Sequence, residues 1–386
     1  MRVLVVHNAY QQRGGEDAVV LNEVTMLRAK GHDVHLHLLS NEKISGWMGR
    51  FRAACAAVFS IASYRRISVI IDGFKPDVVH VHNFFPLMSP AVFYACARKR
   101  VPSIFTLHNY RIVCPTALLM HDGVVTERSL REGPWWAVSQ GVYRGSWLGT
   151  AALATMISVH RRIGTWSRRV TRFIALTGFA ASKFAAAGIP GERISVKSNF
   201  VDVPLQSDRD RSGFLFAGRL SPEKGVEVLV DAVKLLDGAL VKIAGGGPLE
   251  GRLSGAPGLI PLGVLGADAM YREMASSQAL ILPSVWYEGF PMVLVEAYAC
   301  GLPVIASRLG AMAELVDDGV TGLLFDPGSA DDLARKMRWA MEHPEAMARM
   351  GRAARARYEA EYTQEINYSQ LVAIYRDAMD AVGRTE

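Results

Sequence analysis

The sequence predicts an α/β protein made of two Rossmann-like, doubly wound domains. Short apolar runs, such as residues 3–6, 173–176 and 214–217, alternate with stretches whose apolar residues recur at helical spacing. Such alternation is typical of parallel sheets covered by helices. The pattern restarts after residues 203–212, where Pro204 and clustered Asp and Arg residues indicate a linker. With 386 residues, half of them hydrophobic, the chain is long enough for two ordinary domains.

The N-terminal domain is expected to cover residues 1–203. Its first helix shows the pattern clearly, because Val20, Val24 and Leu27 recur at helical spacing and Gly31 follows as a terminator. Residues 114–172, rich in Trp, Arg and small apolar side chains, are predicted as a helical insertion. The expected elements are strand 2–7, helix 16–30, strands 33–39, 77–82, 103–107 and 173–176, and helix 178–187.

The C-terminal domain is expected to cover residues 212–362. Its predicted elements are strand 214–217, helix 225–236, strand 240–244, helix 271–277, strands 280–282 and 304–306, and helices 330–342 and 344–361. A last helix within residues 363–386 has no obvious place in the second sheet. The architecture therefore suggests that it returns to the N-terminal domain.

Charge and cysteine usage narrow the function classes. The net charge of +6 suits an anionic ligand or an anionic membrane surface, and no nucleic-acid-binding signature is present. The four cysteines, Cys55, Cys96, Cys114 and Cys300, lack the spacing of a disulfide framework or a zinc site. With no signal-peptide pattern and only short apolar runs, the expected location is the cytoplasm.

Two basic stretches with interspersed apolar residues, 47–66 and 144–172, leave two interpretations open. They could rest on an anionic bilayer at the inner face of the membrane, or pack on the N-terminal domain as ordinary helices.

The most informative segment is residues 288–296, in which Glu288 and Glu296 flank a Gly-Phe-Pro turn. An apolar strand precedes it and a helix that Gly301 can end follows. Free backbone N–H groups at such a helix start bind phosphorylated ligands, and both carboxylates could accept hydrogen bonds from a polyhydroxylated ligand in one crevice. The alternatives are two solvated glutamates in an ordinary loop, or Glu288 as a helix cap.

Two cations follow the first strand of the C-terminal domain. Arg219 and Lys224 lie five positions apart around a Ser-Pro-Glu turn, and a guanidinium and an ammonium both suit an anionic ligand. In the N-terminal domain, Gly14 and Gly15 would let the backbone approach phosphates closely. His7, His80 and His82 alternate on two strands, but we interpret them as satisfied histidines, because no acidic residue shares their pattern.

Six motifs in order resemble family 4 glycosyltransferases of the GT-B fold, of the polysaccharide-biosynthesis type. They are Gly14-Gly15, Thr106-Leu107-His108, and residues 217–225, 245–248, 288–296 and 301–306. Residues 109–115 resemble a subgroup linked to cell-surface polysaccharides, although the extra downstream cysteines common in that subgroup are missing. The resemblance implies two domains facing a central cleft, with the acceptor bound by the first and the nucleotide-sugar by the second.

The resemblance further implies a retaining hexosyltransferase that moves a sugar from a UDP- or GDP-sugar to a hydroxyl of a polysaccharide or a lipid-linked glycan. It implies neither a cofactor nor a metal. A nucleotide-sugar epimerase and a non-catalytic sugar-nucleotide-binding subunit remain as alternatives. The implied catalytic residues are His108, Arg219, Lys224 and Glu288. The implied donor-binding residues are Gly14, Gly15, Gly218, Val264, Phe290, Pro291, Met292, Val293 and Glu296.

Overall fold

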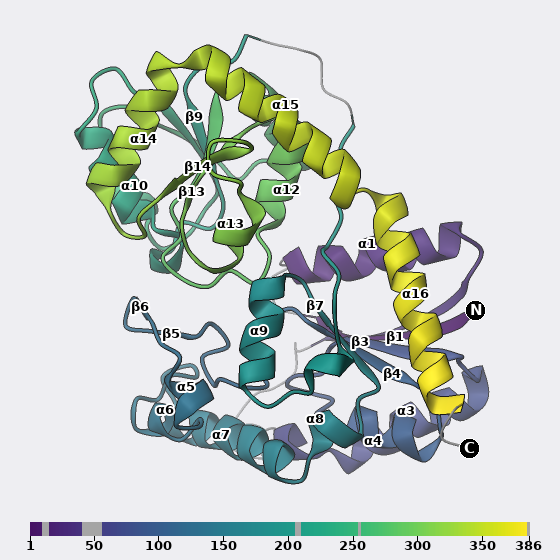
Figure 1. Cartoon of the computed structure of the whole chain (residues 1–386). Helices are drawn as coiled ribbons and strands as arrows, with labels where there is room; N and C mark the ends of the chain where they lie inside the picture. The colour runs from purple at the N-terminus through teal and green to yellow at the C-terminus, as the bar shows by residue number, and fades with distance from the viewer. Residues whose placement is uncertain (10–14, 41–55, 205–209, 254–255, 384–386) are drawn as a thin grey trace. The chain divides into compact units, whose positions relative to one another are not determined.

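The computed structural model describes residues 1–9, 15–40, 56–204, 210–253 and 256–383 (Figure 1). Gly14, Cys55 and residues 47–55 of the first basic stretch therefore lie outside the described residues. The chain divides into two compact units. Unit 1 comprises Met1–His121, Thr126–Ser198 and Asn367–Glu386, and unit 2 comprises Asp122–Val125 and Asn199–Ile366.

The sheet of unit 1 is parallel and has the strand order β2-β1-β3-β4-β7-β8. β1 and β3 are buried almost throughout, as expected for central strands that carry helices on both faces. The chain runs from β1 to β2 on one side and then returns to β3 on the other, so the topological switch point lies between β1 and β3. The strands are β1 Arg2–Ala9, β2 Asp33–Ser40, β3 Val78–Asn83, β4 Ser103–Leu107, β7 Arg172–Ala175 and β8 Ile194–Val196.

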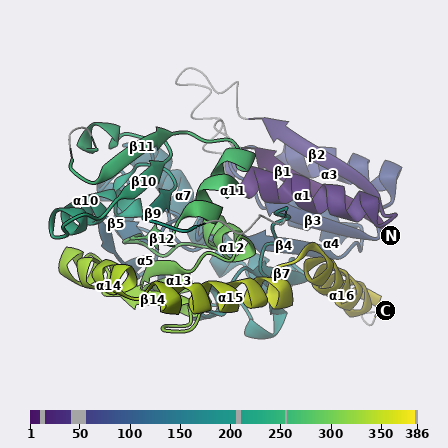
Figure 2. The ribbon, with the colours of Figure 1, turned by 90° about the horizontal axis from the view of Figure 1, so that it is seen from above.

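Helices cover this sheet, with α1 packed on β1 and β2 (Figure 2). The predicted helical insertion contains four helices, α5 to α8, but also two very short strands, β5 Met120–His121 and β6 Val124–Val125. The helices named here are α1 Gly15–Ala29, α3 Ile61–Phe74, α4 Ala91–Arg98, α5 Arg128–Arg131, α6 Trp136–Ser139, α7 Trp147–Arg162, α8 Thr165–Arg168, α9 Gly178–Ala186 and the 3₁₀ helix η1 Gly191–Arg193.

The C-terminal helix α16, Gln364–Gly383, belongs to unit 1 from Asn367 onward. The hydroxyl of its buried Tyr375 lies 2.8 Å from Nδ1 of His80 in β3. Near the start of the helix, the Asn367 amide donates to the carbonyl of Ser198 at 2.6 Å. These buried polar contacts fix the helix against the rest of the unit.

The sheet of unit 2 is also parallel, in the order β11-β10-β9-β12-β13-β14, and Figure 2 shows β11, β10, β9 and β12 side by side. Its core contains Phe214, Leu229, Ile281, Leu333 and Met337. The strands are β9 Phe214–Ala217, β10 Val241–Ala244, β11 Leu259–Gly263, β12 Ala279–Leu282, β13 Val304–Ser307 and β14 Gly322–Phe325. The helices are η2 Pro222–Lys224, α10 Val226–Lys234, η3 Glu250–Arg252, α11 Ala267–Ser276, α12 Met292–Ala299, α13 Gly310–Leu315, α14 Ala330–Glu342 and α15 Pro344–Glu361.

Besides β5 and β6, the strands β8, β11 and β14 of the described residues have no counterpart among the sequence predictions. β8 and β11 are sheet-edge strands, and β11 is largely exposed and contains Pro261, so the apolar periodicity that marks a strand is absent there. α11 also begins at Ala267, earlier than predicted. No helix in the described part of the chain is long and apolar enough to cross a membrane.

Candidate functional site

The carboxyl edge of the unit 2 sheet carries three connected loops at the switch point between β9 and β12. We call residues 218–225, 245–247 and 283–291 the switch-point loops. The Leu220 amide donates to the Gly246 carbonyl, and the Val285 amide donates to the Glu223 carbonyl, both at 3.0 Å. These backbone bonds hold the ends of β9, β10 and β12 together where doubly wound sheets bind ligands.

Two glycines allow these loops to approach so closely. Gly225 has φ +69°, and a Cβ at this position would lie 1.9 Å from the carbonyl oxygen of Pro283. Gly245 has φ +148°, and its Cβ would lie 1.9 Å from the carbonyl oxygen of Gly218. Since no side chain fits at these distances, glycine is required at both positions.

Lys224 and Glu288 meet directly within the switch-point loops. The Lys224 ammonium donates to Glu288 Oε1 at 2.7 Å, and the hydroxyl of the buried Ser284 donates to the same oxygen at 2.7 Å. Glu288 is 5% exposed, and no described residue hydrogen-bonds its other oxygen, Oε2. The Lys224 ammonium also lies 5.5 Å from the ring centroid of Trp286. An ammonium has three N–H donors, so Lys224 can bind an anion while it keeps Glu288.

The turn that follows Glu288 leads into α12. Phe290 is buried, and its ring lies 6.2 Å from that of Tyr362. Pro291 is the N-cap of α12 in an extended conformation, with ψ 96°. The N-cap residue makes no side-chain hydrogen bond to the first turn of α12, which contains the amides of Met292 and Val293.

The structure does not join every predicted residue to the Lys224–Glu288 pair. Arg219 is exposed just after β9, next to Gly218. Val264 follows β11 and is 82% exposed. Glu296 is half-buried in α12, and its burial raises its pKa. The pKa of Tyr271 is raised to about 12, first by the burial of Tyr271 and then by the charge of Glu296. No described contact links Arg219 or Glu296 to Lys224 or Glu288.

His108 lies in unit 1, directly after β4, and belongs to a buried polar cluster at the carboxyl edge of that sheet. Its Nε2 lies 3.0 Å from Nδ1 of His82, and the two rings are nearly parallel, at 22°. His82 Nε2 lies 3.4 Å from Glu23 Oε2, and Lys197 donates to Glu23 Oε1 at 2.7 Å. We define this set, Glu23, His82, His108 and Lys197, as the Glu23–His108 chain.

A third histidine, His80, and two hydroxyls extend the cluster. His80 lies with its Nδ1 2.8 Å from the Tyr375 hydroxyl and its Nε2 2.7 Å from the Thr106 hydroxyl. In the first turn of α1, the carboxylate of Asp17 lies 2.8 Å from His7 Nε2. The predicted donor-binding residue Gly15 is the exposed first residue of this helix. The expected satisfied histidines are confirmed for His80. His7 Nδ1 and His82 Nε2 are buried and have no hydrogen-bond partner among the described residues.

One premise of that prediction was wrong, because an acidic residue does share the pattern. Glu23, His80 and His82 place one ligand-type atom each within 4.8 Å of one another. Glu23 escaped notice because it comes from α1 rather than from the strands. The ammonium of Lys197 on Glu23 already supplies a positive charge, which opposes the binding of a cation there.

Burial and charge determine the protonation of this cluster. Burial raises the pKa of the Glu23 carboxyl, but the charge of Lys197 and the contacts with His82 and His80 together hold that pKa well below its usual value. For His80 and His108, burial followed by the charge of His82 holds the pKa well below the usual value. His80 and His108 are therefore neutral at pH 7, and Glu23 is ionised.

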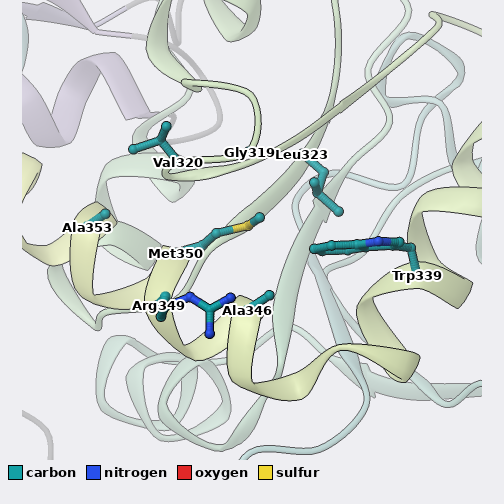
Figure 3. A pocket seen from close by; sticks show the side chains of 8 residues that line it. All are labelled: Gly319, Val320, Leu323, Trp339, Ala346, Arg349, Met350 and Ala353. Carbon is teal, nitrogen blue, oxygen red and sulfur yellow. The ribbon is translucent and has the colours of Figure 1, made fainter.

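A hollow of about 520 Å³ lies elsewhere in unit 2, between β14, α14 and α15 (Figure 3). Leu323, Trp339 and Met350 direct their side chains toward a common space in Figure 3, and Arg349 is the charged residue of the lining. None of the predicted site residues lines this hollow. Its lining lacks the acid–base and multiple polar groups of the switch-point loops, and we assign it no role.

Sequence reasoning missed three polar residues of these clusters. Glu23 had a detectable signal, because it occupies the apolar stripe of α1 between Val19 and Leu27, where a charge needs a buried partner. Lys197 and Ser284 follow strand ends and carry no comparable signal.

Two separate doubly wound parallel sheets in one chain are the architecture of the GT-B fold. Two sequence families match in succession: Glycosyltransferase Family 4 over residues 13–204, and Glycosyl transferases group 1 over residues 200–357. The chain therefore belongs to the family 4 glycosyltransferases of the GT-B fold.

Among similar proteins is the sulfoquinovosyl transferase SQD2 of Arabidopsis thaliana, 26% identical over 78% of this chain and 56% of its own length. The D-rhamnosyltransferase WbpZ of Pseudomonas aeruginosa is 34% identical over 41% of this chain and 44% of its own. The chain spans about half the length of the curated relatives it matches. The crystal structure of Anabaena HepE in complex with UDP and glucose is similar in fold, with 18% identity, coverage of 97% of this chain and 98% of that chain, and a TM-score of 0.69.

Proposed function

We propose that this protein is a retaining glycosyltransferase that transfers a sugar from a UDP- or GDP-sugar to a hydroxyl of a polysaccharide or a lipid-linked glycan. The observation that carries the proposal is the Lys224–Glu288 pair within glycine-dependent loops at a switch point, with a bond of 2.7 Å. A cation held there by a buried carboxylate suits the diphosphate of an activated sugar. The complexes of HepE with UDP and with UDP-glucose support this donor class.

Lys224 would act on the leaving group. As the bond to the sugar breaks, negative charge grows on the departing diphosphate, so a cation fixed beside it stabilises the transition state more than the ground state. Arg219, exposed at the end of β9, would be the second cation. Glu288 would hold Lys224 through Oε1 and offer Oε2 to a hydroxyl of the transferred sugar.

The remaining donor contacts would come from the same edge of unit 2. Gly218 and the amides of Phe290, Met292 and Val293 would bind phosphate or sugar oxygens through the backbone. Glu296 would accept hydrogen bonds from the ribose hydroxyls, and the backbone at Val264 would contact the base. Gly14, Gly15 and His108 of unit 1 would serve the phosphates and the transferred sugar. In a retaining reaction the leaving phosphate would take the proton of the acceptor hydroxyl, and no metal or cofactor would take part.

A location at the inner face of the cytoplasmic membrane is part of the proposal. The outward face of α3 carries Arg65 and Arg66 between the exposed apolar residues Ile61 and Val69. Such a face suits an anionic bilayer. Flotation with vesicles that contain anionic lipid should recover the protein, whereas the variant Arg65→Gln/Arg66→Gln should stay behind; equal recovery of both would remove this part of the proposal.

The decisive experiment compares Lys224→Met with Lys234→Met on a panel of nucleotide sugars. Lys234 is the matched control, because it forms an exposed ion pair with Asp231 on α10. We expect Lys224→Met to lower kcat/KM for transfer about 10²- to 10³-fold, the loss typical of one charge-stabilising group. Lys234→Met should stay within about twofold. A Lys224→Met variant within twofold of the parent protein would refute the phosphate role.

The products distinguish the alternatives. The anomeric configuration of the product, read by NMR, tests retention. Turnover of the donor into a second nucleotide sugar without an acceptor would identify an epimerase. Donor binding by calorimetry without turnover would identify a non-catalytic subunit.

A further inference from the structure

In the Glu23–His108 chain, the hydrogen-bonding atoms determine which group donates and which accepts at each step. Glu23 Oε1 is taken by Lys197 at 2.7 Å, so Oε2 is the oxygen that faces His82. Oε2 of Glu23 and Nε2 of His82 are both buried and have no other hydrogen-bond partner in the described residues. At 3.4 Å they are each other's available partner.

An ionised carboxylate oxygen can only accept a hydrogen bond. If His82 Nε2 carried no proton, two lone pairs would face each other in a buried site, which is costly. A neutral His82 therefore carries its one ring proton on Nε2. Nδ1 of His82 is then an acceptor, and its neighbour at 3.0 Å, Nε2 of His108, must be the donor.

We propose that Glu23 is a positioning residue that acts through His82 to fix His108 as its Nε2–H tautomer, so that His108 Nδ1 accepts a hydrogen bond from the ligand. No described residue hydrogen-bonds Nδ1 of His108, and the side chain is only half-buried. Burial is the largest cause that holds the pKa of His108 well below its usual value, so this imidazole is neutral at pH 7 and Nδ1 keeps its lone pair.

The proton direction has a consequence for the substrate class, and this step rests on the proposed function. A lone pair at Nδ1 attracts a hydroxyl or an amide N–H and repels a carboxylate. A transferred sugar that meets His108 would therefore present a neutral hydroxyl at that position. A uronic acid with its carboxylate at that position would be excluded.

The test uses the full chain with ¹⁵N-labelled histidine and long-range ¹H–¹⁵N correlation, which shows which ring nitrogen carries the proton. We expect His82 and His108 both to be Nε2–H tautomers at pH 7. A proton on Nδ1 of His108 in the unsubstituted protein would overturn the proposal. This readout needs no activity and no variant.

Glu23→Gln tests the cause. Lys197 will keep the amide oxygen on its side, so the amide NH₂ will face His82 Nε2 and donate to it. Both histidines should then reverse to their Nδ1–H tautomers. Glu192→Gln, an exposed change in η1, is the matched control and should leave both tautomers unchanged. An unchanged tautomer in folded Glu23→Gln would show that Glu23 does not set the direction.

Activity separates this inference from the proposed function. For a neutral hexose donor we expect Glu23→Gln to raise KM more than it lowers kcat, and to reduce the preference over the matching uronic acid donor by about tenfold. Absence of turnover with every donor would refute the proposed function while the tautomer assignment stands. Turnover with an unchanged donor preference in a tautomer-reversed variant would refute the specificity step alone.

Discussion

Removing the counter-charge of a buried carboxylate should destabilise unit 1 by an amount that depends on pH. Lys197 is 1% exposed and Glu23 is 2% exposed, with 2.7 Å between Nζ and Oε1. Lys197→Met keeps most of the apolar stem of the side chain but leaves the Glu23 carboxylate buried without a cation. Breaking a buried pair in this way typically costs about 3–5 kcal/mol.

Protonation of Glu23 sets an upper limit to that cost. A glutamate in the unfolded chain has a pKa of about 4.3, and pH 7 lies about 2.7 pH units above it. Protonating Glu23 at pH 7 therefore costs roughly 3.7 kcal/mol. At pH 5 the same step costs only about 1 kcal/mol. The native pKa of Glu23 lies below its unfolded value in the parent protein. It should rise above that value in the variant, because burial then acts without the charge of Lys197. The loss in free energy of unfolding of Lys197→Met, relative to the parent protein, should therefore grow as the pH rises from about 4.3 to 7.

The assay is urea unfolding at pH 5, 6 and 7, followed by hydrogen exchange of peptides from β1 and β3, because two units need not unfold together. We expect a deficit of about 3–4 kcal/mol at pH 7 that shrinks to about 1 kcal/mol at pH 5. The double variant Glu23→Gln/Lys197→Met should recover most of it. A deficit that is below about 1 kcal/mol at pH 7, or independent of pH, would refute the reasoning.

Three further predictions concern other features. Gly225→Ala should lower the midpoint of thermal unfolding by several degrees and abolish donor binding, since its Cβ would lie 1.9 Å from a carbonyl oxygen. The control Gly238→Ala, at φ +74° with no atom within 4 Å of the added Cβ, should lower the free energy of unfolding by only about 1 kcal/mol. Tyr375→Ala should cost about 3–5 kcal/mol in denaturant unfolding, and Tyr375→Phe, which loses only the hydroxyl partner of His80, about 1–2. Burial lowers the pKa of His80 and His108, so below about pH 6.5 the unfolded chain binds more protons than the folded protein. The free energy of unfolding should therefore fall as the pH drops from about 6.5 to 5.5, by up to about 1.4 kcal/mol per pH unit for each histidine. A calorimetric stability that does not change over this pH range would contradict this prediction.

The fold was predictable from sequence where burial is strong and periodic. β1, β9 and β12 are apolar runs between turn signals, so both sheets could be recognised from them. β11 could not, because an exposed edge strand with a proline lacks the buried pattern.

The candidate site was predictable only in part. Lys224 and Glu288 lie 64 positions apart, yet both follow strands of one sheet, which is why their meeting could be anticipated from motif order. Glu23 and Lys197 are 174 positions apart on a helix and after an edge strand. No local pattern connects them, since their pairing depends on the register of α1 against the sheet.

The assignment of residues from Asn367 onward to unit 1 has a consequence for biosynthesis. Residues 199–366 form an insertion within unit 1, so they leave the ribosome before the helix that brings Tyr375 to His80 has been made. Because domains generally fold as units during synthesis, residues 199–366 should acquire their structure before unit 1, which also needs the residues from Asn367 onward.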